Sequence, residues 1–128
     1  MVKANAYGIG AVEATRALEA LDPWGYGVVT VEEGVALRRA GIDRPIIVFG
    51  PLTIEAAGVC LREELRPVIG DLEGLRLWLA TGDRPFHVEI DTGMGRLGLP
   101  WRDREGIAEA GRMLALAPGW EGVFTHFH

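Results

Sequence analysis

The sequence predicts an α/β fold built from repeated strand–helix–strand units around a parallel sheet. Short runs rich in β-branched and aromatic residues alternate with stretches of helical periodicity, at a spacing of about 20 residues. The strand-like runs are almost continuously apolar, as expected where helices cover both faces of a sheet. Several of the helical stretches also begin at a Thr or Asp residue that can cap a helix.

The expected elements follow one another along the chain as about six strands and five helices. Strands are predicted at Val2–Lys3, Tyr26–Thr30, Pro45–Phe49, Arg66–Ile69, Phe86–Ile90 and Gly122–Thr125. Helices are predicted at Ala11–Leu21, Val31–Ala40, Thr53–Leu61, Asp71–Ala80 and Asp103–Leu116. Four helices have a side-chain oxygen at their start that can accept hydrogen bonds from the first backbone N–H groups. These N-cap residues are Thr30, Thr53, Asp71 and Asp103. Gly41 follows two arginines and suits a C-cap, because glycine adopts left-handed conformations and cations favour the negative helix end.

Length and composition limit the class of protein. No Pro-, Ser- or Gly-rich linker divides the 128 residues, so a single structural unit is expected. The net charge of −5, without a basic cluster, argues against a nucleic-acid or membrane partner. The single cysteine, Cys60, excludes an internal disulfide and suits a reducing cytoplasm. No apolar run reaches the roughly 18 residues of a membrane span, so a soluble, cytoplasmic protein is expected.

Two architectures agree with this alternation of strands and helices. A doubly wound open sheet would be complete at this length, whereas a (β/α)₈ barrel would be about two strand–helix units short. The periodicity of the sequence does not decide between them.

Three motifs resemble those of the bacterial alanine racemases, in the same order along the chain. They are MVKANAYG at Met1–Gly8, EIDTGMGRLG at Glu89–Gly98 and THF at Thr125–Phe127. The resemblance implies an N-terminal (β/α)₈ TIM barrel followed by a mostly β C-terminal domain. Residues 1–128 would then be an incomplete barrel domain, truncated at both ends, with about six of the eight strand–helix units and without the C-terminal β-domain.

The resemblance also implies the reaction. The protein would be a pyridoxal phosphate (PLP)-dependent isomerase that interconverts L-alanine and D-alanine and supplies D-alanine for cell-wall peptidoglycan. In the family, a tyrosine of the partner subunit serves the second face of the substrate, and no residue here matches it. A homodimer is therefore expected, and the 128-residue chain alone is expected to be nearly inactive. A non-catalytic PLP-binding fragment, a racemase of broader specificity and a decarboxylase of the same barrel type remain alternatives.

The first motif contains the principal catalytic candidate, Lys3. The resemblance implies that Lys3 forms a Schiff base with the cofactor and handles the α-proton on the D-alanine side, although most lysines are solvated surface charges. Tyr7 matches the tyrosine that helps to hold the cofactor phosphate, against the plain alternative of a half-buried loop aromatic. Asn5 and Gly8 are expected to shape the loop. Ile9 stands where the family commonly has histidine, so any role of that histidine is missing.

The second motif contains a G-x-G-x-x-G pattern that superficially matches a dinucleotide fingerprint. That fingerprint requires the glycines to open a helix, whereas Leu99-Pro100 follows here, so residues 91–99 are expected to form a loop. Arg96 within this loop has the planar fork that suits a carboxylate. The resemblance implies that Arg96 faces the phenolic oxygen of the cofactor and the carboxylate of the substrate.

Three further residues complete the candidate site. Some family members carry a carbamate-modified lysine at the position of Glu89, and we interpret Glu89 as a permanent mimic of that negative charge beside Arg96; the alternative is an exposed strand glutamate. Asp91 is expected to accept hydrogen bonds from loop amides. The resemblance places His126 beside the cofactor ring. His126 and His128 have a spacing compatible with a metal, but further ligands are lacking, so no metal site is expected.

Overall fold

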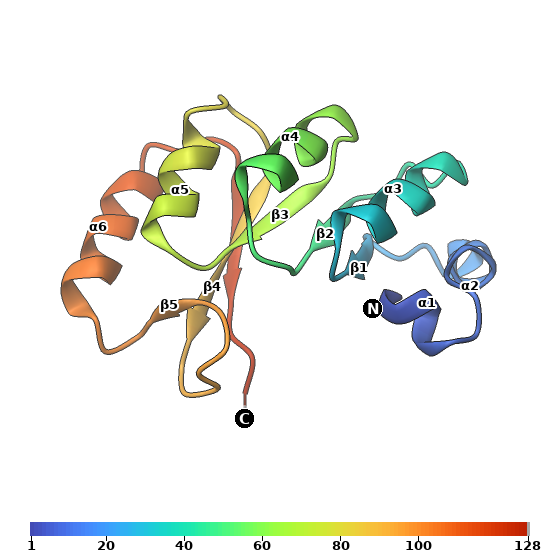
Figure 1. Ribbon diagram of the computed structural model, residues 1–128, viewed down its shortest axis with the longest axis horizontal. Coiled ribbons are helices and arrows are strands. Elements are labelled where there is room, and N and C mark those ends of the chain that lie inside the picture. Colours follow the sequence, from blue (N-terminus) through green and yellow to red (C-terminus); the bar gives the residue numbers. More distant parts are fainter. Residues whose placement is uncertain (128) are drawn as a thin grey trace. The chain divides into compact units, whose positions relative to one another are not determined.

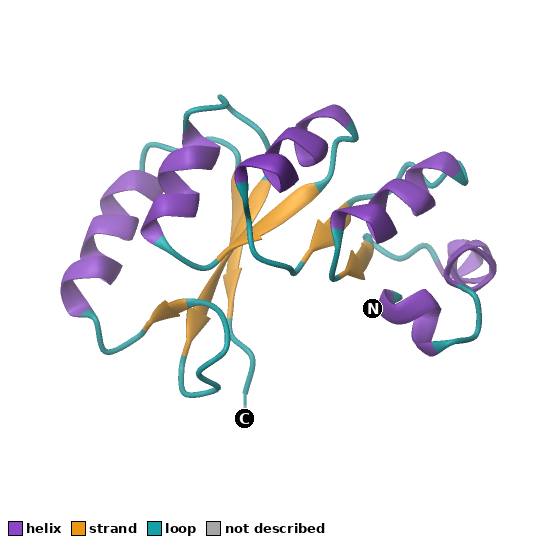
Figure 2. Cartoon of the chain, viewed as in Figure 1, coloured by secondary structure: helices purple, strands orange, loops and turns teal. Residues whose placement is uncertain are grey.

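Every strand pairing in the computed structural model is parallel (Figures 1 and 2). The structure describes residues 1–127. The strands are β1 (Tyr26–Val28), β2 (Ile46–Val48), β3 (Arg66–Ile69), β4 (Phe86–Asp91), β5 (Leu99–Pro100) and β6 (Trp120–Phe124). The helices are α1 (Lys3–Tyr7), α2 (Ala11–Leu18), α3 (Val31–Arg39), α4 (Ile54–Arg62), α5 (Leu72–Leu79) and α6 (Arg104–Leu114), with a 3₁₀ turn, η1, at Glu19–Leu21. The predicted α/β class with a parallel sheet is confirmed.

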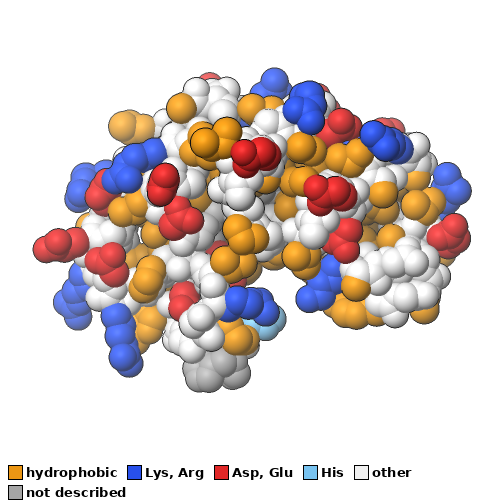
Figure 3. Space-filling view, viewed as in Figure 1, with side chains coloured by type: hydrophobic (Ala, Val, Ile, Leu, Met, Phe, Trp, Pro, Cys, Tyr) orange, Lys and Arg blue, Asp and Glu red, His pale blue; other side chains and the backbone are white. Residues whose placement is uncertain are grey.

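The chain forms two compact units. The first contains residues 1–50 and 58–67, and the second contains residues 51–57 and the chain from Val68 onward. The single domain expected over residues 1–128 stays a prediction. Acidic and basic side chains are interspersed on the face shown in Figure 3.

The first unit is organised by α3 against β1 and β2. The two strands pair in register from Tyr26 opposite Ile46. Gly34 lets α3 approach closely, since a Cβ atom there would lie 2.9 Å from a methyl group of Leu65. Leu37 on the same helix is buried. The position of α3 matters for the site, because its first turn lies next to the N-terminal segment.

The second unit is centred on β4, which pairs with β3, β5 and β6. Phe86 and Val88 on β4 and Trp78 on α5 are fully buried and form its core. Helices α5 and α6 lie beside each other (Figure 1), joined by an ion pair between Arg76 and Glu109. The carboxyl ends of β4 and β6 lie at one edge of the sheet, and both lead into residues of the candidate site.

The helix starts follow the predicted caps. The side chains of Thr30, Asp71 and Asp103 each accept a hydrogen bond from the amide three residues on. Thr53 does the same for the amide of Ala56, at 3.1 Å. Gly41, with φ of +84°, follows the end of α3 as predicted.

Three elements differ from the predictions. The strand at Val2–Lys3 is wrong: the backbone turns left-handed at Ala4, so only Val2 pairs, through its N–H to the carbonyl of Gly27 at 2.8 Å. The last turn of the predicted helix Ala11–Leu21 is 3₁₀. The short strand β5 was not predicted, because two residues carry no periodicity.

Candidate active site

Lys3 opens a turn of left-handed helix, which is α1. Ala4, Asn5, Ala6 and Tyr7 have φ between 50° and 56°. Each non-glycine residue in this region costs roughly 1–2 kcal/mol relative to the right-handed helix. Four in succession persist only where surrounding contacts hold them, and such strained segments cluster at functional sites.

Several hydrogen bonds hold this turn. The N–H of Ala4 donates to Glu33 Oε1 at 2.7 Å, and the N–H of Ala11 donates to Asn5 Oδ1 at 2.8 Å. Gly8, with φ of +95°, ends the turn and donates to the carbonyl of Ala4 at 3.0 Å. Asn5 and Gly8 therefore shape the loop as predicted.

The turn places the Lys3 amine near the Tyr7 ring. Lys3 is half-buried, and its Nζ lies 6.0 Å from the ring centroid, at the outer limit of a cation–π contact. Tyr7 is 66% exposed, so it is not the half-buried loop aromatic of the plain alternative. An exposed phenol beside a lysine amine gives this surface both a nucleophile and a hydrogen-bonding group.

The glycine-rich loop closes on the end of β4. Asp91 Oδ1 accepts the N–H of Gly93 at 2.9 Å and that of Gly95 at 3.1 Å, so the predicted role of Asp91 in binding loop amides is confirmed. Asp91 ends β4 and Leu99 begins β5, so the loop is shorter than the predicted 91–99. Helix α6 begins only at Arg104, so the glycines do not open a helix. The G-x-G-x-x-G pattern is therefore not a dinucleotide fingerprint, as predicted.

Glu89 is buried on β4, with 6% of its surface exposed, so the alternative of an exposed strand glutamate is wrong. Burial raises the pKa of this carboxyl group, and the charges of Arg96 and His126 oppose that rise. The charge of Asp91 adds to the rise. Arg96 and His126 are exposed. The positive charges of Arg96 and His126 therefore favour the ionised form of the buried Glu89 carboxylate.

A contact between two threonines connects the loop with the end of β6. Thr92 Oγ1 and Thr125 Oγ1 are 2.7 Å apart. Thr92 precedes the glycines and Thr125 precedes His126, so this bond fixes the spacing of the two segments. Neither this bond nor the role of Glu33 was predicted from the sequence. The signal for Glu33 was present, because Thr30-Val31-Glu32-Glu33 is a capping box.

The candidate residues fall into two groups, one in each unit. Lys3 and Tyr7 belong to the first unit, whereas Glu89, Asp91, Arg96 and His126 belong to the second. The structure brings the members of each group together within their own unit. Among residues 1–127, no group of three His, Cys, Asp or Glu side chains could hold a metal ion, and His128 lies outside the described residues. In the same part of the chain, no helix is long and apolar enough to cross a membrane.

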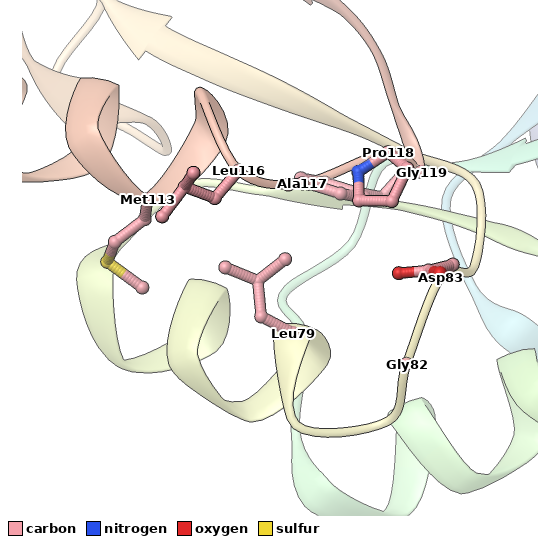
Figure 4. Close-up of a pocket in the computed structure, with 9 residues that line it drawn as sticks. Leu79, Gly82, Asp83, Met113, Leu116, Ala117, Pro118 and Gly119 are labelled. Carbon is pink, nitrogen blue, oxygen red and sulfur yellow. The ribbon is translucent and has the colours of Figure 1, made fainter.

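A cavity of about 270 Å³ lies in the second unit (Figure 4). It is lined by Leu79, Met113 and Leu116, with Asp83 at its rim. It also touches Phe86, the first residue of β4, whereas Asp91 ends that strand. The cavity is thus at the opposite end of β4 from Asp91, and its lining is mostly apolar apart from the carboxylate of Asp83.

Comparison with known proteins identifies relatives over the whole length of the chain. Residues 1–128 match the family described as alanine racemase, N-terminal domain. The alanine racemase of Symbiobacterium thermophilum is 45% identical over 139 residues, covering 98% of this chain and 34% of the relative. The chain spans about a third of the length of the curated relatives it matches.

Solved structures agree with the sequence comparison. The alanine racemase of Clostridium difficile 630 is similar with a TM-score of 0.89 and 32% identity, over 99% of this chain and 35% of that one. That protein has also been solved in complex with cycloserine. A histidine racemase of Leuconostoc mesenteroides has a TM-score of 0.81 at 23% identity, over 99% of this chain and 36% of that one, and shows a shared fold alone. The predicted partial TIM-barrel fold is confirmed by these neighbours.

Proposed function

This chain belongs to the alanine racemase family, and from that premise we propose that the protein is a PLP-dependent isomerase that interconverts L-alanine and D-alanine. The observation that carries the proposal is Lys3, which is held at the start of a strained, hydrogen-bonded turn within the family's N-terminal motif. The D-alanine that it forms would be used in peptidoglycan. The buried, free thiol of Cys60, whose pKa burial raises to about 11, suits a reducing cytoplasm.

Each unit offers side chains of the kind that PLP requires. Lys3 would bind it covalently through Nζ, and Tyr7 is exposed and free to approach a phosphate group. Arg96 would face its phenolic oxygen, and His126 its ring. When bound, PLP supplies an electron sink that weakens the Cα–H bond of the amino acid.

The chemistry assigned to the protein is proton transfer and orientation. Lys3 Nζ would take or return the α-proton on the D-alanine side of the substrate. The guanidinium of Arg96 would hold the substrate carboxylate through its planar fork. Asp91 would act indirectly, because its hydrogen bonds to Gly93 and Gly95 shape the loop that carries Arg96.

We assign Glu89 the role of a permanent carbamate mimic. Its carboxyl group is buried on β4, and the charge of Arg96 favours its ionised form. Glutamate carries that negative charge without a chemical modification, so the orientation of Arg96 would not depend on carbon dioxide. Replacing Glu89 with Gln is expected to weaken substrate binding, with the larger effect on KM, because the negative charge that acts on Arg96 would be lost.

The second face of the substrate needs another acid–base group. No residue of the chain matches the tyrosine that serves this role in the family, so we assign it to the partner subunit of a homodimer. The 128-residue chain by itself is therefore expected to have almost no racemase turnover. Measurable turnover from this chain alone would contradict that expectation.

Lys3 is the only lysine in the sequence, which makes the cofactor proposal easy to test. The protein is incubated with PLP, reduced with borohydride and mapped by mass spectrometry, with Lys3→Arg as control. We expect the adduct on Lys3, whereas the control retains only the N-terminal amine. An adduct that favours the N-terminus over Lys3 would count against a preorganised cofactor lysine.

The reaction itself is tested on a chain with the full length of the relatives, of which residues 1–128 span about a third. D-alanine formation from L-alanine is measured with added PLP and compared with the Lys3→Arg variant. L-serine and L-histidine serve as competing substrates, because the shared fold does not select the side chain. Faster conversion of either one than of L-alanine would replace the alanine assignment by the alternative of a different specificity.

A further inference from the structure

Lys3 lies between two backbone amides that are each anchored to another element. The N–H of Val2 donates to the carbonyl of Gly27 on β1 at 2.8 Å. The N–H of Ala4 donates to Glu33 Oε1 on α3 at 2.7 Å. The backbone of Lys3 is thus held on both sides, and the second anchor is a side chain 29 residues away in the sequence.

The carboxylate of Glu33 binds two segments at once. While Oε1 accepts the N–H of Ala4, Oε2 accepts the N–H groups of Val29 at 2.8 Å and Thr30 at 3.2 Å. An ordinary capping box needs only the bond to the N-cap residue, here Thr30. The bond to Ala4 is additional, and it fixes the first residue of the left-handed turn.

Glu33 is ionised at neutral pH. Burial raises its pKa, but the N–H groups of Val29, Ala4 and Thr30 outweigh burial, and the net pKa is lowered. The charge of Lys3 contributes to the lowering. An ionised carboxylate forms the stronger class of hydrogen bond and has two oxygens that accept without donating.

We propose that Glu33 is a positioning residue that couples the start of α3 to the backbone around Lys3. Its oxygens hold the strained turn and thereby set the position of the lysine amine. The inference rests on the proposed function only in the role given to the amine; the coupling of the two segments stands on the geometry.

The test separates the bond to Ala4 from the capping of α3. Glu33→Ala removes both, whereas Thr30→Ala weakens the cap and leaves the carboxylate in contact with Ala4. Glu33→Gln keeps the size of the side chain but has a single acceptor oxygen, so it can serve only one of the two segments. Hydrogen exchange of the Ala4 amide is measured in each variant, together with the rate at which PLP and borohydride label Lys3.

We expect Glu33→Ala to accelerate exchange at Ala4 by about 10- to 100-fold, the effect of losing a hydrogen bond to a charged acceptor. Labelling of Lys3 should slow by about tenfold, Glu33→Gln should lie between, and Thr30→Ala should change neither quantity. Equal effects of Glu33→Ala and Thr30→Ala on exchange at Ala4 and on labelling of Lys3 would show that Glu33 acts only by capping α3. That result would overturn the proposal. Unchanged exchange at Ala4 in Glu33→Ala would overturn it too. A wild-type protein that is not labelled at Lys3 would count against the proposed function, while the exchange at Ala4 would still decide the role of Glu33.

Discussion

At the scale of single residues, the glycine-rich loop depends on a close approach that only glycine allows. Gly98 has φ of +111°, and a Cβ atom there would lie 2.6 Å from the amide nitrogen of Asp91. Gly95 also has a positive φ, of +70°, but has open space around it. Substitution of Gly95 therefore tests the cost of the positive φ alone, whereas substitution of Gly98 tests that cost together with a steric clash.

We expect Gly98→Ala to lower the free energy of unfolding by about 2 kcal/mol or more, because strain and a backbone clash add together. Gly95→Ala should cost only about 1 kcal/mol, the penalty of a left-handed alanine. Urea unfolding of the two variants measures the difference. Equal losses of unfolding free energy in the two variants would show that the close approach of Gly98 to Asp91 adds nothing to the cost.

Glu89 should give the protein a distinct pH dependence. Since its pKa is raised in the folded state, that state binds more protons than the unfolded chain above the unfolded value of about 4.3. The contribution of Glu89 to stability is therefore greatest below this value and is lost as pH rises through the folded pKa. The stability of the wild type relative to Glu89→Gln should therefore fall as pH rises from the unfolded value of about 4.3 through the raised folded pKa.

Urea unfolding at several pH values checks this, with the exposed Glu105→Gln as a control. A relative stability that rises with pH would mean that the attraction of Arg96 and His126 outweighs the burial of Glu89.

At the scale of elements, α6 shows how local chemistry sets where a helix begins. Its N-cap, Asp103, accepts the N–H of Gly106 at 3.0 Å. A Cβ atom on Gly106 would collide with the carboxylate of Asp103. Gly111, in the last turn but one, is exposed and has nothing within 4 Å of such an atom. The same residue type thus serves the cap at one position and only weakens the helix at the other.

Opposite effects are expected from the same substitution in α6. Gly111→Ala should raise the free energy of unfolding by about 0.5–1 kcal/mol, since it reduces the conformational entropy of the unfolded chain. Gly106→Ala should lower it by roughly 0.5–2 kcal/mol, because the Asp103 cap is displaced. Thermal unfolding of the two variants measures the difference. Stabilisation by Gly106→Ala would show that the Asp103 side chain can move away from the new Cβ atom without loss of stability.

At the scale of the whole molecule, the parallel sheet has an open edge at β6. This strand pairs with β4, and no strand among residues 1–127 pairs with its other edge. Val123 on β6 is 55% exposed, and Trp120 is also exposed. A strand at the edge of a sheet with exposed apolar side chains is a template for pairing with another chain.

We therefore expect this chain to self-associate as its concentration rises, and Val123→Lys to reduce that association by placing a charge on the edge. Val123→Thr is the matched control, because it keeps the β-branched shape without the charge. Sedimentation velocity over a range of concentrations measures the effect. Equal association in all three proteins would place the contact elsewhere on the surface.

Features whose cause lies within a few residues could be predicted from the sequence. The N-caps at Thr30 and Asp103 and the turn around Asp91 arise from hydrogen bonds between residues two to four apart. Continuous apolar runs likewise marked the buried strands. The three motifs identified the family, because they record residue types and order rather than geometry.

Features that depend on contacts between residues far apart in the sequence could not be predicted. No local preference favours four non-glycine residues in a left-handed turn, and the bond from Ala4 to Glu33 that holds it spans 29 residues. The bond between Thr92 and Thr125 spans 33 residues. The burial of Glu89 depends on the neighbours of β4. Periodicity and spacing depend only on residues that are close together in the sequence. For this reason the strand predicted at Val2–Lys3 was wrong, and the hydrogen bonds that anchor the backbone around Lys3 could not be predicted.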